Sequence, residues 1–271
     1  MLFRSVATDP RTVSEADVLV VAVKTYDTES ALESISHLRV GTVLSIQNGV
    51  LKDEQLARTF GWDKTLGAAA FLSGGVTPEG PVRFTVNEYL VLGELPAGIS
   101  PRVETLVTAL ANAGIRAEAV SQIRTVEWSK YALFMSWMAP AVLTRLPSYR
   151  FQTHSDTAAV VACLMRETGQ LAAKLGILLE DREPLPIKTL CTTTLSEAVT
   201  AIRRFGEVMA ARAPAHKVST LQDLEAGRRL EVEETLGYAV RKAAELGIPA
   251  PTLETCYRLI AGLSASIYKA S

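Results

Sequence analysis

The chain has 271 residues, of which 48% are hydrophobic and 21% are charged, and its formal net charge is −1 at pH 7. This is the composition of a globular protein, long enough for one large domain or two smaller ones. The near-neutral charge, with no cluster of Lys and Arg to offset it, argues against nucleic acid as a partner. The longest apolar runs, at 18–23 and 139–143, are far shorter than the roughly 20 residues that span a bilayer, so no membrane association is expected.

The N-terminal segment and the cysteines indicate a cytoplasmic protein. Residues 1–5 lack the apolar stretch of a signal peptide. Cys163, Cys191 and Cys256 are scattered along the chain, which predicts neither a disulfide framework nor a metal site. We therefore expect three buried thiols.

The first part of the chain, residues 1–121, is predicted to form an α/β domain. Val18–Val23 is a continuous apolar run, typical of a strand that is buried on both faces of a parallel sheet. Residues 82–85 and 89–93 predict a hairpin joined through Val86-Asn87. The other elements expected here alternate between helix and strand: helices at 27–38, 52–59 and 101–113, and strands at 42–46 and 65–71.

The second part, residues 122–271, is predicted to be an all-α domain. Apolar residues recur with helical periodicity, most clearly at 128–143 and 158–175. Further helices are expected at 192–209, 219–226, 231–246 and 251–264.

Two polar residues follow the predicted parallel strands directly. Such sheets bind ligands just beyond the carboxyl ends of their strands, where Lys24 and Asn48 are expected. Each residue also has an ordinary interpretation, since a lysine often ends a strand in solvent and Asn48-Gly49 is a common tight-turn pair. None of the 17 glycines form the G-x-G spacing of a phosphate-binding loop.

Three polar residues stand out in the predicted helical domain. Lys130 lies on an almost uncharged helix, where its ammonium either reaches out to water or is partly desolvated and able to donate a proton. Ser219 fits an S-x-x-Q capping box, and the same geometry suits a carboxylate ligand. Glu231 belongs to a run of Arg and Glu that is usually solvated, but it also begins a helix with an apolar face.

Six short motifs resemble those of the ketopantoate reductases (2-dehydropantoate 2-reductases) in their order and spacing: A-D-V-L-V-V-A-V-K at 16–24, Q-N-G at 47–49, W-S-K at 128–130, S-T-L-Q-D at 219–223, G-R-R-L-E at 227–231 and G-I-P-A-P-T at 247–252. The resemblance implies an oxidoreductase that uses NADPH to reduce the ketone of 2-ketopantoate to pantoate, a precursor of pantothenate and coenzyme A. It also implies a Rossmann-type domain, a helical domain similar to that of 6-phosphogluconate dehydrogenases, and a homodimer.

The resemblance also implies roles for individual residues. Lys130 would be the general acid that protonates the carbonyl oxygen as hydride reaches the carbon. Glu231 would orient the substrate hydroxyl and Ser219 would contact its carboxylate. Lys24 and Asn48 would line the cofactor side of the cleft.

The sequence departs from the family pattern in two places. Family members carry G-x-G-x-x-G before the position where this chain begins, so the resemblance implies an N-terminally truncated member with an incomplete Rossmann-like sheet. Phe134 and Met138 stand where ketopantoate-reducing members usually have Asn, which favours another 2-keto acid or ketone as substrate. The alternative is a non-catalytic remnant, a binding or dimerisation module of the same family.

Overall fold

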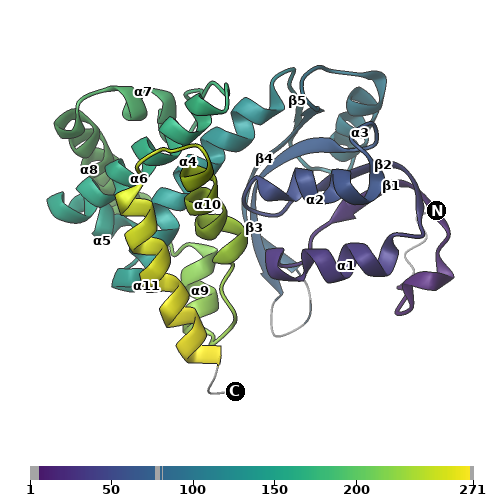
Figure 1. Cartoon of the computed structure of the whole chain (residues 1–271). Helices are drawn as coiled ribbons and strands as arrows, with labels where there is room; N and C mark the ends of the chain where they lie inside the picture. Colours follow the sequence, from purple (N-terminus) through teal and green to yellow (C-terminus); the bar gives the residue numbers. More distant parts are fainter. Residues whose placement is uncertain (1–5, 77–79, 81, 269–271) are drawn as a thin grey trace. The chain divides into compact units, whose positions relative to one another are not determined.

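The computed structural model describes residues 6–76, 80 and 82–268. The chain divides into two compact units, Met1–Glu127 and Trp128–Ser271, which Figure 1 colours from purple to teal and from teal to yellow. The expected α/β domain followed by a helical domain is confirmed. The division lies within helix α4 (Ile123–Thr144), slightly beyond the domain boundary expected after residue 121.

The strands of the first unit form a mixed arrangement. β1 and β2 pair in parallel, β3 pairs antiparallel with β4, and β4 pairs in parallel with the short β5. A single parallel bridge between Val43 and Thr65 connects β2 to the start of β3. The bounds are β1 Glu15–Val21, β2 Arg39–Ser45, β3 Leu66–Val76, β4 Val82–Glu94 and β5 Ala117–Ala119.

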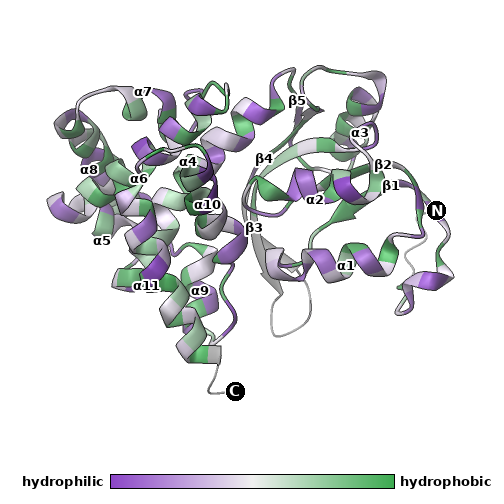
Figure 2. Ribbon diagram, viewed as in Figure 1, coloured by the Kyte–Doolittle hydropathy of each residue, from purple (hydrophilic) through white to green (hydrophobic). Residues whose placement is uncertain are grey.

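Three helices and the start of α4 cover these strands. α1 (Thr28–Ile35) and α2 (Leu51–Phe60) pack on β1 and β2 through Leu32, Leu56 and their neighbours. α3 (Pro101–Asn112) packs on β3 and β4 around Val103. Figure 2 shows alternating hydrophilic and hydrophobic bands along α1, as expected for a helix with one buried stripe.

The prediction that Val18–Val23 is buried on both faces is wrong. Val18 is 40% exposed and Val20 is 48% exposed, whereas Val21 is 5% exposed. Among the described residues β1 pairs with β2 alone, and α1 and α2 cover only the side that carries Leu19 and Val21. An unbroken apolar run therefore does not show how many faces of a strand are covered.

The predicted hairpin at 82–93 is also wrong, because these residues form the single strand β4. β4 pairs with β3 through shifts in register, with Phe71 opposite Tyr89 and Leu72 opposite Asn87. β4 thus accommodates two extra residues, Glu88 and Thr85, as bulges on either side of Val86-Asn87, where the sequence suggested a turn.

The second unit is helical. The predicted helix at 192–209 is observed slightly later as α8, after a separate short helix α7. The helices that complete this unit after α4 are α5 Ser148–Thr153, α6 Ser155–Lys174, α7 Ile187–Thr192, α8 Leu195–Arg212, α9 Ser219–Glu225, α10 Tyr238–Glu245 and α11 Pro251–Tyr268. Within the described ranges, none of the helices is both long and apolar enough to cross a membrane.

The regular helix predicted at 231–246 begins two residues later, and its first turn is π-helical. Residues Glu233–Gly237 form a π-helical turn, here called the π-turn, and α10 begins only at Tyr238. Its defining bond runs from the Gly237 N–H to the Val232 carbonyl at 2.9 Å. π-helical turns are rare and recur at functional sites, and this one begins two residues after Glu231.

The first turn of α4 packs closely against a pair of glycines. Gly67 of β3 and Gly93 of β4 face each other in register. A Cβ atom added to Gly93 would lie 2.4 Å from the Val120 carbonyl oxygen and 2.8 Å from Ile123 Cβ, and one added to Gly67 would lie 2.7 Å from Ile123 Cγ2. The helix can approach the strands this closely because both positions lack a side chain.

Candidate functional site

The first unit brings together the two loops that follow β1 and β2. The last paired residues of these strands are Val21 and Ser45, and Lys24 and Asn48 each lie three positions further on. Both side chains are half-buried. The structure thus places the two predicted cofactor residues on adjacent loops at the same end of two parallel strands.

Gln47 holds these two loops together. Its Nε2 donates to the Val23 carbonyl at 2.7 Å and to Thr28 Oγ1 at 2.8 Å, and its Oε1 accepts from Ser45 Oγ at 2.8 Å. The side chain is buried and fully engaged in these contacts. Sequence reasoning quoted Gln47 within the Q-N-G motif but gave it no role. A glutamine at a strand end could have suggested a bridge between neighbouring loops.

Lys130 lies in the interior of α4, because the helix begins at Ile123 and not at Trp128 as predicted. Lys130 is half-buried, whereas Ser129 is 4% exposed and Tyr131 is 1% exposed. Phe134 is half-buried and Met138 has no exposed surface, one and two turns further along the helix.

Both neighbours of Lys130 are fixed by hydrogen bonds within the second unit. Ser129 Oγ accepts from the Glu180 N–H at 2.9 Å, and Tyr131 Oη donates to the Thr235 carbonyl at 2.7 Å. The backbone at Lys130 is therefore held by hydrogen bonds on both sides. A side chain that must keep one geometry in order to bind or react needs such preorganisation.

A buried charge cluster anchors α4 one turn before Lys130. Lys52 Nζ lies 2.8 Å from Asp53 Oδ1 and 2.5 Å from Glu127 Oε1, and Glu127 Oε1 also accepts from the Ala68 N–H at 2.9 Å. Burial raises the pKa of Glu127 and the nearby Asp53 carboxylate raises it further, although Lys52 opposes both effects. Burial alone would lower the pKa of Lys52, but Asp53 and Glu127 together raise it. Sequence reasoning assigned nothing to these residues.

The capping box predicted at Ser219 is not formed. Val218 is the N-cap residue of α9, and it makes no side-chain capping bond. Ser219 already has helical geometry and is exposed, while Gln222 Nε2 donates backwards to the Lys217 carbonyl at 2.8 Å. Ser219 therefore does not cap α9, and its role as a ligand-binding residue stays a prediction.

The S-T-L-Q-D and G-R-R-L-E motifs are joined by Asp223 and Arg228. The Arg228 N–H donates to the Asp223 carbonyl at 2.8 Å, and Arg228 Nη1 lies 3.1 Å from Asp223 Oδ1. Asp223 is 3% exposed. This contact closes the turn between Ser219 and Glu231, and sequence reasoning did not identify it.

Glu231 is 5% exposed and lies two residues before the first residue of the π-turn. The Thr235 side chain, which is fully buried, donates from Oγ1 to the Glu231 carbonyl. The position of Glu231 thus depends on the π-turn, and not on a regular helix as predicted.

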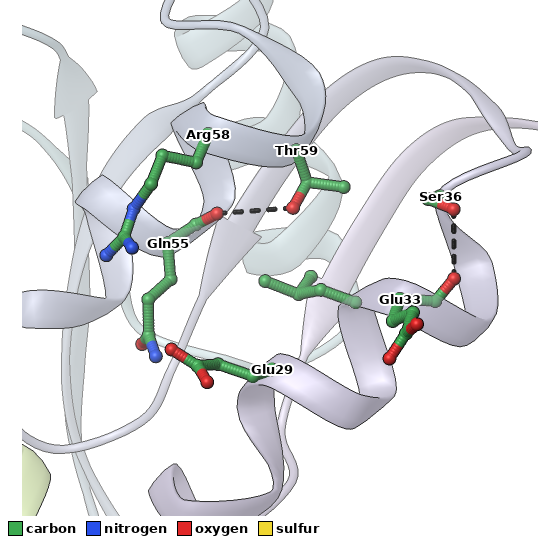
Figure 3. Close-up of a pocket in the computed structure, with 7 residues that line it drawn as sticks. Glu29, Glu33, Ser36, Gln55, Arg58 and Thr59 are labelled. Atoms are coloured by element: carbon green, nitrogen blue, oxygen red, sulfur yellow. Dashed lines mark hydrogen bonds between the residues drawn. The ribbon is translucent and has the colours of Figure 1, made fainter.

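A separate pocket lies between α1 and α2. It has a volume of about 320 Å³, and Figure 3 shows the Glu29 carboxylate from α1 and the Gln55 amide from α2 pointing toward one another. Leu32 also lines it, and none of the predicted site residues does.

Comparison with known proteins gives consistent matches over most of the chain. A family profile described as Ketopantoate reductase PanE/ApbA matches residues 2–97, and its C-terminal counterpart matches residues 122–264. The 2-dehydropantoate 2-reductase of Archaeoglobus fulgidus is 28% identical over 253 residues, covering 93% of this chain and 78% of that protein. The enzyme of the same name from Halobacterium salinarum is 28% identical over 258 residues, covering 94% and 78%.

Solved structures agree with the sequence matches. A PanE/ApbA family ketopantoate reductase from Ralstonia eutropha JMP134 has a TM-score of 0.76 and 28% identity, covering 97% of this chain and 80% of that one. D-mandelate dehydrogenase, solved with NADH and anilino(oxo)acetate, has a TM-score of 0.78 and 17% identity, covering 94% of this chain and 78% of that one. At this identity the match shows a similar fold only.

An α/β unit followed by a helical unit, with these relatives, defines a two-domain oxidoreductase. The particular family follows from the two profiles, which together match most of the chain. The chain belongs to the ketopantoate reductase family.

Proposed function

We propose that this chain reduces a 2-keto acid with a nicotinamide dinucleotide, NADPH in particular, and that Lys130 is the general acid. The observation that carries the proposal is the setting of Lys130. It is a half-buried lysine on a helix whose backbone is fixed on both sides of it, by Ser129 and Tyr131. The relatives named 2-dehydropantoate 2-reductase support the reaction class.

The chemistry assigned to Lys130 is proton transfer and charge stabilisation. Reduction of a ketone builds negative charge on the carbonyl oxygen. A positioned ammonium stabilises that charge and then transfers its proton, leaving a neutral amine and a hydroxyl group on the product. Partial burial strengthens the interaction, since water screens it less.

Glu231 and Ser219 are assigned to substrate binding. The Glu231 carboxylate would accept a hydrogen bond from a hydroxyl group of the substrate and so fix the orientation of the ketone. The exposed Ser219 hydroxyl would donate to the substrate carboxylate.

The strand-end loops of the first unit fit a nicotinamide dinucleotide. They supply an ammonium, Lys24, and an amide, Asn48, on adjacent loops joined by Gln47. An ammonium suits a phosphate, and an amide suits ribose hydroxyls or a carboxamide. When bound, the dinucleotide supplies the hydride. The solved D-mandelate dehydrogenase complex with NADH shows such a cofactor on the same fold.

Phe134 and Met138 are assigned to the substrate side of the same helix as Lys130. Both are apolar, which favours a 2-keto acid with an apolar side chain over one that must be held by amide hydrogen bonds.

A homodimer is proposed in addition, since a ketopantoate reductase of Staphylococcus aureus is described as dimeric.

The first experiment is a fluorescence titration of the chain with NADPH and, in parallel, with NADH. Binding in the micromolar range supports the proposal, and tighter binding of NADPH supports the finer assignment. Lack of binding at millimolar cofactor contradicts the proposal and favours the non-catalytic alternative.

The second experiment measures reduction of 2-dehydropantoate and of 2-oxoisovalerate, which lacks the hydroxyl group. Lys130→Ala should lower kcat by about 100-fold or more, the size of a lost general acid. Lys174→Ala is the control, because Lys174 is exposed at the end of α6. An unchanged kcat in Lys130→Ala would remove Lys130 from the mechanism.

A further inference from the structure

We propose that Tyr131 is a positioning residue that couples the helix carrying Lys130 to the backbone of Glu231 through Thr235. The inference deepens the proposed function and rests on it, because it concerns how two residues assigned to that reaction are held in register. All the contacts that carry it lie within the second unit.

Two successive hydrogen bonds form the connection. Tyr131 Oη donates to the Thr235 carbonyl at 2.7 Å, and Thr235 Oγ1 donates to the Glu231 carbonyl. One end of this relay is the residue next to Lys130 in the sequence, and the other end is Glu231 itself. A displacement of either side chain along the relay therefore moves the two proposed functional residues relative to each other.

The two side chains of the relay are buried, so bulk water does not compete for their hydrogen bonds. Tyr131 is 1% exposed and Thr235 is fully buried. The Tyr131 ring also packs edge-on against Trp128 at 5.5 Å and against Tyr238 at 6.5 Å between ring centroids. Burial raises the pKa of Tyr131 well above its usual value, so the phenol stays protonated and remains a donor.

The relay contacts the backbone at the π-turn. In a regular α-helix each carbonyl receives an N–H from four residues ahead, whereas here the Gly237 N–H reaches back five residues to Val232. The Thr235 carbonyl accepts from Tyr131 Oη as well as from the Tyr238 N–H, and the Glu231 carbonyl accepts from the Thr235 hydroxyl. The relay therefore adds side-chain bonds to the backbone of the π-turn.

The outer side of the π-turn is fixed independently. Arg241 Nη2 donates to the Glu233 carbonyl at 2.8 Å, and Tyr257 Oη donates to the Glu233 carboxylate at 3.0 Å. A Cβ atom added to Gly237 would lie 3.0 Å from Arg241 Nη1. The turn therefore keeps its shape when only the inner contact is removed, and loss of the Tyr131 bond is expected to shift Glu231 without unfolding the segment.

The test compares four variants in reduction of 2-dehydropantoate and in its binding to the chain with NADPH present. Tyr131→Phe removes the first bond and Thr235→Val removes the second. Thr235→Ser keeps the hydroxyl, and Tyr149→Phe is a matched control on α5, outside the relay. We expect KM and the dissociation constant for the keto acid to rise about tenfold in Tyr131→Phe and Thr235→Val, and to stay near the wild-type values in the other two.

Changes in the KM for the keto acid separate positioning from a purely structural role, which would lower the active fraction and hence kcat alone. An unchanged KM in both Tyr131→Phe and Thr235→Val overturns the inference, as does an equal rise in Thr235→Ser or Tyr149→Phe. If Tyr131→Phe does not fold, the two Thr235 variants decide. Failure of the proposed function has a different signature, namely full activity in Lys130→Ala.

Discussion

Lys52 Nζ lies 2.5 Å from Glu127 Oε1, so that a buried ion pair ties α2 to the first turns of α4. The same Glu127 oxygen accepts from the Ala68 N–H of β3, and Asp53 completes the cluster. Three elements of the first unit thus meet at one carboxylate, one helical turn before Lys130. Because two carboxylates share one ammonium, the stability that this cluster contributes should depend on pH.

The first prediction concerns Glu127→Gln. Burial, followed by the Asp53 carboxylate, raises the pKa of Glu127, so the folded state keeps this proton to a higher pH than the unfolded chain does. Its stabilising contribution is complete below the usual carboxyl pKa and is lost as the pH rises through the raised value. Glu127→Gln should flatten the fall in the free energy of unfolding between about pH 5 and about pH 9.

Denaturant unfolding at a series of pH values measures this change. Glu104→Gln, on the exposed side of α3, is the matched control and should keep the wild-type slope. An identical slope in Glu127→Gln and the wild type would show that Glu127 does not titrate in this range.

The second prediction concerns Lys52→Met, which leaves Asp53 and Glu127 buried without their cation. Removing one partner of a buried charge cluster typically costs about 3–5 kcal/mol of the free energy of unfolding. The loss at pH 8 should exceed the loss at pH 5, because Glu127 can take up a proton at the lower pH. Adding Glu127→Gln to Lys52→Met should recover part of the stability. Equal losses at both pH values would contradict this account.

The third prediction concerns Glu167 of α6, which caps α11 from a distance in the sequence. Its two carboxylate oxygens accept from the Thr252 N–H at 2.9 Å and the Leu253 N–H at 2.8 Å. Glu167→Gln replaces one acceptor by an NH₂ group that faces a backbone donor, and should cost about 1.5–3 kcal/mol in thermal or denaturant unfolding. Glu254→Gln, which alters only an exposed pair on α11, should change stability far less.

The fourth prediction concerns substrate choice and Phe134. Phe134→Asn introduces an amide one helical turn after Lys130. The ratio of kcat/KM for 2-dehydropantoate to that for 2-oxoisovalerate should rise about tenfold, because a polar side chain favours the hydroxylated acid. Phe134→Leu is the control, since it removes the ring without adding a hydrogen-bonding group. A fall in both activities without a change in their ratio would mean that Phe134 does not contact the substrate.

Much of the architecture could be predicted from periodicity. Helices such as α6 and α8 follow from apolar residues at helical spacing, and the positions of Lys24 and Asn48 follow from the ends of two apolar strands. These features depend on short stretches of sequence, and each stretch carries its own signal.

The remaining features depend on contacts that local patterns do not encode. The sequence Val86-Asn87 is compatible with a turn or with a strand that has bulges beside it, and only pairing with β3 selects the strand. The apolar spacing of Val232, Leu236 and Val240 suggests a regular helix, whereas the buried bond from Tyr131 accompanies a π-turn there. The Lys52–Glu127 contact joins residues far apart in the chain, so it could not be predicted from a local sequence motif.

The π-turn has a consequence for how this segment tolerates changes in length. A π-helical turn is equivalent to an α-helix into which one residue has been inserted. Deleting one residue within Glu233–Gly237 would therefore restore regular helical bonding, with little cost to the helix itself. It would also turn everything before the deletion by about 100° relative to α10, Glu231 included. Length at this point is consequently constrained by the orientation of Glu231 and of the buried residues beside it, and not by hydrogen bonding within the helix.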